Sequence, residues 1–212
     1  VNGNDGAERF AIFTNGTHVE LDRLSPAPFR IDHVSVETVV LNLAGGDDEL
    51  DASGLQAASG VELLADGGAG NDTIIGSQAN DVLLGGEGND FIVGGRGDDT
   101  AFLGAGDDRF LWNPGEGNDL IEGQAGLDTL DFNGSGANEK MDIVANGGRA
   151  LVLRDVANIT MDMNDVERIN IKALAGADRI TVNDLSGTDV RGVFLDLASG
   201  GAADGAADTV VV

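Results

Sequence analysis

A nine-residue period in the middle of the chain constrains the fold more than any other feature of the sequence. Residues 67–93 read GGAGNDTII, GSQANDVLL and GGEGNDFIV, and GGRGDDTAF and LGAGDDRFL follow in phase. Each block has Asp in the sixth place, and the eighth place is apolar. Two extra residues enter around WNPGEGND before GQAGLDTLD resumes the pattern. Such a period predicts one small unit stacked many times along an axis.

Each block divides into a turn and a short strand. The glycine-rich half must adopt conformations with positive φ, which glycine reaches without a steric penalty. The last three residues suit a strand with one side chain pointing inward. The predicted core is therefore a thin column of aliphatic and aromatic residues: Ile74, Leu83, Ile92, Ala101, Phe110, Ile121 and Leu130.

The carboxylates fall into two columns if two blocks make one coil. Residues 18 apart then stack at the interstrand spacing of about 4.8 Å. Like charges at that distance repel by roughly 0.8 kcal/mol in water and by about 3 kcal/mol at an effective dielectric of 20. The predicted columns are Asp72, Asp90, Asp108 and Asp128 on one side, and Asp81, Asp99 and Asp119 on the other.

A hard divalent cation between successive loops would reverse this repulsion. Calcium accepts six to eight oxygen ligands, which include carboxylates and backbone carbonyls. We expect the aspartates of both columns to be calcium ligands, together with the backbone carbonyls of Gly67, Gly85 and Gly94. Three gaps in one column and two in the other predict about five Ca²⁺ ions.

The repeats closely resemble the RTX family, the hemolysin-type calcium-binding nonapeptide repeats with the pattern G-G-x-G-x-D-x-U-x. The resemblance covers residues 67–131, and its complete loops are GGAGND, GGEGND and GGRGDD. It implies a right-handed parallel β-roll with calcium held between turns. It also implies type I secretion from a bacterium, with folding on contact with external calcium.

Four loops depart from the pattern. GSQAND lacks the glycines of the second and fourth places, LGAGDD lacks the first, PGEGND has Pro there, and GQAGLD lacks the second. The sites of Asp81, Asp119 and Asp128 are therefore less well supported by the sequence. GGDDEL, AGADRIT and GAADTVV resemble altered copies of the loop, so Asp48, Asp178 and Asp208 are further candidate ligands or, alternatively, solvated turn residues.

The segments on either side of the repeats resemble each other. NGNDGAERFAIFTNG (2–16) matches NGSGANEKMDIVANG (133–147), and residues 36–53 parallel residues 166–183. Alternating apolar residues predict strands in both segments. The Asn-Gly pairs at 15–16 and 146–147 suit either type I′ hairpins or corners of a solenoid. We expect an all-β chain with an N-terminal flank (1–66), a calcium-binding β-roll (67–132) and a second, homologous flank (133–212).

Charge and composition exclude several function classes. The net charge of -25 argues against nucleic acid or an anionic membrane surface and favours cations as partners. The absence of Cys excludes disulfides and thiolate metal sites. No apolar run approaches 18 residues, so we expect no membrane insertion. G-x-S-x-G and H-E-x-x-H are absent, and neither His18 nor His33 lies in a catalytic pattern, so we expect no enzymatic activity.

These patterns favour a calcium-binding structural module of a larger, secreted bacterial protein. Its expected partners are calcium and the rest of a multi-repeat parent chain. The alternative is a calcium-dependent adhesion or polysaccharide-binding module, in which the same scaffold presents a surface to a glycan or a cell.

Overall fold

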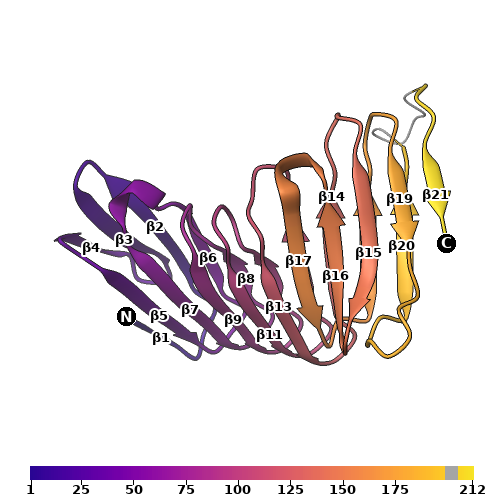
Figure 1. Ribbon diagram of the computed structural model, residues 1–212. Helices are drawn as coiled ribbons and strands as arrows, with labels where there is room; N and C mark the ends of the chain where they lie inside the picture. Colours follow the sequence, from indigo (N-terminus) through magenta and orange to yellow (C-terminus); the bar gives the residue numbers. More distant parts are fainter. Residues whose placement is uncertain (199–204) are drawn as a thin grey trace.

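The molecule consists of strands and tight turns. A computed structural model describes residues 1–198 and 205–212, and Figure 1 shows the strands side by side along an elongated body. Two single-turn 3₁₀ helices, η1 (Ala57–Ser59) and η2 (Val156–Asn158), lie among them. The strands are β1 (Asn2–Asn4), β2 (Arg9–Asn15), β3 (His18–Ser25), β4 (Phe29–Val34), β5 (Thr38–Ala44), β6 (Glu49–Gly54), β7 (Glu62–Ala69), β8 (Thr73–Ile75), β9 (Asp81–Glu87), β10 (Phe91–Val93), β11 (Thr100–Ala105), β12 (Arg109–Trp112), β13 (Leu120–Ala125), β14 (Thr129–Asn133), β15 (Lys140–Asn146), β16 (Arg149–Arg154), β17 (Ile159–Asn164), β18 (Arg168–Lys172), β19 (Arg179–Val182), β20 (Gly192–Asp196) and β21 (Thr209–Val211).

The strands form two sheets that run the length of the molecule. In the first sheet the order is β1-β5-β7-β9-β11-β13-β17-β16-β15-β19-β21, and in the second it is β20-β18-β14-β12-β10-β8-β6-β2-β3-β4. Through the repeats, successive strands of the chain alternate between the sheets and pair in parallel with strands one coil away. This arrangement confirms the predicted all-β fold, a parallel β-roll.

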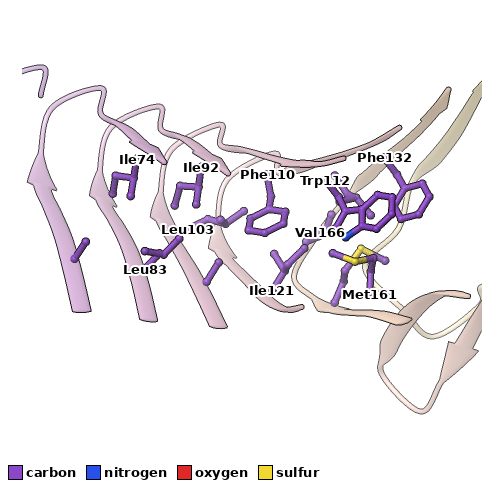
Figure 2. Close-up of a cluster of buried hydrophobic side chains, with 14 of the residues drawn as sticks. Ile74, Leu83, Ile92, Leu103, Phe110, Trp112, Ile121, Phe132, Met161 and Val166 are labelled. Carbon is purple, nitrogen blue, oxygen red and sulfur yellow. The ribbon is translucent and has the colours of Figure 1, made fainter. Parts of the chain in front are cut away.

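The register follows the nine-residue period. Ile74 pairs with Ile92, 18 residues further on, and Leu83 pairs with Ala101 in the same way. After the inserted pair of residues the offset becomes 20, as in Phe110 opposite Leu130. All of the predicted core residues are fully buried: Ile74, Leu83, Ile92, Ala101, Phe110, Ile121 and Leu130. Figure 2 shows several of them, among them Ile74, Ile92 and Phe110, pointing between the sheets.

An aromatic pair fills the core at the insertion. The rings of Trp112 and Phe132 stack with centroids 4.3 Å apart and an interplanar angle of 3°. The indole Nε1–H of Trp112 donates to the carbonyl of Gly117 at 2.9 Å, so the one polar group of the buried ring is satisfied. The loop after β12 is closed by Asn113, whose N–H donates to Glu116 Oε2 at 2.6 Å.

The flanks contain hairpins inside sheets that continue from the repeats. β6 pairs in parallel with β8, and β14 pairs in parallel with β18. β2 and β3, and likewise β15 and β16, are antiparallel, with Asn15 opposite His18 and Asn146 opposite Arg149. The Asn-Gly pairs therefore lie at hairpins.

The turn type of these hairpins differs from type I′, the hairpin type that was one of the two alternatives for the Asn-Gly pairs. The two loop residues of the first hairpin are Gly16 and Thr17, and only Gly16 has positive φ, at 65°. A glycine alone with positive φ at the first loop position is the type II′ pattern. The Asn of each pair belongs to the strand and not to the loop, which is why the sequence signal pointed to the wrong turn.

Candidate metal centre

Each aspartate of the repeats stands at the end of a tight loop, directly before or at the start of a strand. The loop before Asp90 turns through Gly86 (φ 117°) and Gly88 (φ 119°). A Cβ on either glycine would lie 2.0 Å from a carbonyl oxygen of the previous coil. Glycine is required there both for the backbone conformation and for the close stacking of the coils. The glycine loops thereby bring the carboxylates of successive coils together.

The carboxylates stack through hydrogen bonds between coils. The N–H of Asp72 donates to Asp90 Oδ1 at 2.8 Å, and the N–H of Asp90 donates to Asp108 Oδ1 at 2.7 Å. On the opposite side, the N–H of Asp81 donates to Asp99 Oδ1 at 2.8 Å. The same bonds join Asp99 to Asp119 and Asp108 to Asp128. The structure thus builds the two columns that the 18-residue spacing predicts.

The first column extends beyond the nonapeptides into both flanks. The N–H of Asp48 donates to Asp72 Oδ1 at 2.8 Å, and the N–H of Glu8 donates to Asp48 Oδ1 at 2.6 Å. At the other end, the N–H of Asp128 donates to Glu167 Oε2 at 2.8 Å. A separate column in the second flank consists of Glu139, Asp178 and Asp208, joined in the same way.

Three glutamates of these columns are not predicted by the nonapeptide pattern. Glu8, Glu139 and Glu167 take the place of the aspartate, although the nonapeptide pattern specifies Asp. The signal was present in the longer repeat, since Glu8 and Glu139 are equivalent residues that both precede a basic residue.

Most of the stacked aspartates keep one oxygen without a partner. One oxygen, Oδ1, accepts the bond from the neighbouring coil, whereas the other is buried. Within residues 1–198 and 205–212, Oδ2 accepts no hydrogen bond in Asp48, Asp72, Asp90, Asp99, Asp108, Asp119 and Asp128. Buried polar atoms are almost always hydrogen-bonded, so a row of unpartnered carboxylate oxygens calls for a cation.

Backbone carbonyls lie close to these oxygens. Asp72 Oδ2 and the carbonyl oxygen of Gly85 are each 2.5 Å from the point that a Cβ on Gly67 would occupy. The same construction at Gly76 places the carbonyl oxygen of Gly94 at 2.1 Å and Asp81 Oδ2 at 2.7 Å. The missing side chain of the first glycine therefore leaves room for a carboxylate of its own loop and a carbonyl of the next coil.

The available donors are a mixture of carboxylate and backbone carbonyl oxygens, and this mixture suits calcium better than it suits metals that are bound only by side chains. Among the described residues, no group of three or more His, Asp or Glu side chains is placed to hold a metal ion. A cation between coils would take oxygens from one or two aspartates and complete its shell with backbone carbonyls and water. Calcium accepts such a mixed and irregular set of oxygens.

Burial disfavours the charged form of these carboxyl groups. Desolvation is the main cause that raises the pKa of Asp72, Asp90 and Asp108 to about 6. For Asp99, desolvation and the neighbouring Asp119 charge raise the pKa to about 8. A bound cation would offset both effects, because it restores a favourable environment for the carboxylate.

The comparison with protein families agrees with this geometry. A family model described as the RTX calcium-binding nonapeptide repeat, in four copies, matches residues 66–101, 84–111 and 115–135. Residues 66–135 are RTX calcium-binding nonapeptide repeats. The RTX match covers the two columns of the nonapeptides but not Glu8, Asp48 or Glu139, which the structure adds to the same stacked pattern.

Other comparisons add no further relatives to the RTX match. No curated protein and no solved structure shows significant similarity to the chain. The repeat is thus the one domain that the comparisons identify, and no enzyme domain is evident. None of the helices in residues 1–198 and 205–212 has the length and hydropathy needed to span a membrane.

Proposed function

We propose that the chain is a calcium-binding structural module of a larger secreted bacterial protein and that it folds when it meets calcium outside the cell. The unpartnered Oδ2 atoms of the stacked aspartates carry this proposal. Without a cation, the coils would hold rows of buried like charges over a core one side chain wide. With calcium between the coils, the same oxygens become ligands and the repulsion becomes attraction.

The ligands we propose are the nonapeptide aspartates with an unpartnered Oδ2, with the carbonyl oxygens of Gly85 and Gly94 and of the equivalent Gly67. About five ions would bind, and they would reduce the net negative charge of -25 by about ten. The flank aspartates Asp48, Asp178 and Asp208 continue the stacked pattern and extend the proposal to the coils outside the nonapeptides. The module itself is non-enzymatic and supports other parts of its parent chain.

Folding driven by the metal is tested by following strand content and Trp fluorescence while calcium is added to the metal-free chain. Trp112 is the single Trp and is fully buried, so its emission reports closure of the core. We expect the nonapeptide coils to be disordered at submicromolar calcium and ordered near the 10⁻⁴–10⁻³ M typical of extracellular calcium modules. Magnesium at the same concentration is the control. A spectrum rich in strand without metal and unchanged by calcium would refute the proposal.

A second candidate function, binding of a polysaccharide or a cell-surface ligand, has its own observation. A hollow of about 400 Å³ on the second sheet is lined by Arg109, Arg168, Arg191 and Phe194, together with the acidic residues Asp107, Asp108 and Glu167. The Phe194 ring is 54% exposed, and the Arg168 guanidinium lies 5.1 Å from its centroid. Arg109 pairs with Asp131, and Arg191 lies 3.9 Å from Glu167, so the guanidinium that would meet a sugar carboxylate beside the aromatic face is that of Arg168.

This candidate is tested on a glycan array with calcium present, with the wild type beside Phe194→Ala and Arg168→Gln. Retention of uronate-containing glycans that both substitutions abolish would support it. If no glycan is retained while the calcium-bound fold is intact, the structural role is the one function that remains.

A further inference from the structure

Three carboxylates of the stacked columns differ from the seven aspartates with an unpartnered Oδ2, because the chain itself satisfies their second oxygen. Asp81 Oδ2 accepts the N–H of Ser77 at 2.5 Å, and Asp81 Oδ1 accepts the Ser77 hydroxyl at 2.7 Å. Glu139 Oε2 accepts the N–H of Ser135 at 3.1 Å, and Glu8 Oε2 accepts the N–H of Asn4 at 3.0 Å. We call Glu8, Asp81 and Glu139 the self-bonded carboxylates.

Two of the self-bonded carboxylates also form an ion pair with an arginine of the chain. Arg23 forms an ion pair with Glu8, and Arg154 forms one with Glu139, with its Nε 2.8 Å from Oε1. Both glutamate side chains are 0% exposed, and the Arg154 side chain is 2% exposed. A guanidinium at this depth neutralises the carboxylate and fills part of the space beside it.

The backbone of the loop separates the two kinds of carboxylate. In every self-bonded loop, the residue four before the acid is Asn4, Ser77 or Ser135, and none of these has positive φ. Before each aspartate with an unpartnered Oδ2, that residue has positive φ whether or not it is glycine: Ala44, Gly68, Gly86, Gly95, Gly104, Gly115 and Gln124.

This correlation has a direct physical reading. With an ordinary φ, the N–H of the second loop residue donates to the carboxylate of its own loop. With positive φ, that N–H does not reach the carboxylate, and Oδ2 stays available to a cation. The conformation at the second place of the loop, more than the glycine itself, decides which state the carboxylate adopts.

We infer that the self-bonded carboxylates bind no calcium and that the ions occupy the gaps between the aspartates with an unpartnered Oδ2. This inference rests on the proposed function, because it assigns the ions of the same columns. It replaces a site between Asp81 and Asp99 with one between Asp48 and Asp72, outside the matched repeats. The remaining gaps are 72–90, 90–108, 108–128 and 99–119.

The two Glu–Arg pairs mark the points where a carboxylate column begins. Glu8–Arg23 ends the first column towards the N-terminus, and Glu139–Arg154 begins the column of the second flank. At these points the protein supplies its own positive charge. The hairpins that carry the arginines, β2–β3 and β15–β16, therefore fold without metal. The calcium-dependent coils can then stack on these folded hairpins.

The site assignment is tested by counting ions with native mass spectrometry on the calcium-loaded chain. Asp81→Asn should leave the wild-type count unchanged, and Asp48→Asn should lower it by one. Ser77→Gly restores a glycine at the second place, so it should add one ion between Asp81 and Asp99. The double variant Ser77→Gly with Asp81→Asn should return to the wild-type count.

A lower ion count in Asp81→Asn, or an unchanged count in Asp48→Asn, would overturn the inference. Both results presuppose that the wild type binds calcium, so they are distinct from failure of the proposed function. Hydrogen exchange of the wild type in metal-free buffer adds a test without substitutions. The amides of β15 and β16 should be protected there while those of β10 exchange, and the opposite order would contradict the role of the arginine pairs.

Discussion

The backbone N–H of Asp90 donates to Oδ1 of Asp108 at 2.7 Å, while Oδ2 of Asp108 is buried without a donor. One oxygen of the carboxylate thus holds two coils in register, and the other is left for a ligand from outside the chain. The hydrogen bond orients the group before any metal arrives. Preorganised oxygens reduce the entropy lost on binding. The loop therefore holds Oδ2 ready for a cation, since no group in the part of the chain that the structure describes donates to this oxygen.

Replacing one ligand should remove calcium from two neighbouring gaps. Asp90→Asn keeps an oxygen that can accept the N–H of Asp72 but loses the charge. We expect the calcium midpoint of folding to rise about tenfold or more, which corresponds to about 1.4 kcal/mol. Isothermal titration calorimetry and circular dichroism measure this. Asp142→Asn, an exposed residue of β15, removes the same charge and should leave the midpoint unchanged. Equal shifts in both variants would indicate a general charge effect instead.

A methyl group at the first glycine of a loop should block the same site. A Cβ on Gly85 would lie 2.5 Å from Asp90 Oδ2 and 2.2 Å from the carbonyl oxygen of Leu103. Gly85→Ala should therefore weaken calcium binding and destabilise the calcium-bound fold by about 1–3 kcal/mol, measured by urea unfolding. A Cβ on Gly148 meets no atom within 4 Å, so Gly148→Ala is the control and should unfold like the wild type.

The raised pKa values of the stacked aspartates predict the pH dependence of the metal-free chain. Their pKa is about 6 for Asp90 and about 8 for Asp99 in the fold, and about 3.9 when unfolded. The folded state therefore gains protons, so these groups favour the metal-free fold below pH 4 and progressively oppose it as pH rises through 6 to 8. Protons also compete with calcium for the same oxygens.

Two measurements check this dependence. In buffer freed of metal by a chelating resin, strand content should increase as pH is lowered from 8 to 5. Over the same range, calcium affinity from calorimetry should decrease. Both trends should persist in 0.5 M salt, which screens exposed charges but hardly affects buried ones. A metal-free chain with the same strand content from pH 5 to 8 would show that the buried carboxylates do not control folding.

The sequence predicts the coil well because the nonapeptide fixes turn, strand and carboxylate at once. The 18-residue stacking of Asp72 on Asp90 and the burial of Ile74 and Ile92 follow from that period alone. The presence or absence of glycine in the sequence predicts the backbone conformation of the individual loops less well. Gln124 lacks the glycine of the pattern yet adopts φ 70°, whereas Ser77 does not adopt positive φ. Tertiary stacking imposes a strained conformation on Gln124 that local propensity does not predict.

The flanks were predictable as strands but not in their pairing. The alternation of apolar residues identifies β2 and β15, but it does not show that β15 lies in the first sheet and β2 in the second. Nor does it reveal that Arg23 and Arg154 reach back to the carboxylate columns, 15 residues from their partners. Such contacts depend on the hairpin register, which the loop length determines.

The aromatic stack should be the most sensitive point of the thin core. Phe132 is fully buried and parallel to Trp112, and its strand lies between those of Trp112 and Ile171. Phe132→Ala should destabilise the calcium-saturated protein by roughly 3–5 kcal/mol in urea unfolding monitored by Trp fluorescence. Phe29→Ala removes a ring that is 39% exposed on β4 and should cost well under half as much. Similar losses in the two variants would mean that the stack contributes no more than a surface ring, which would contradict a core this thin.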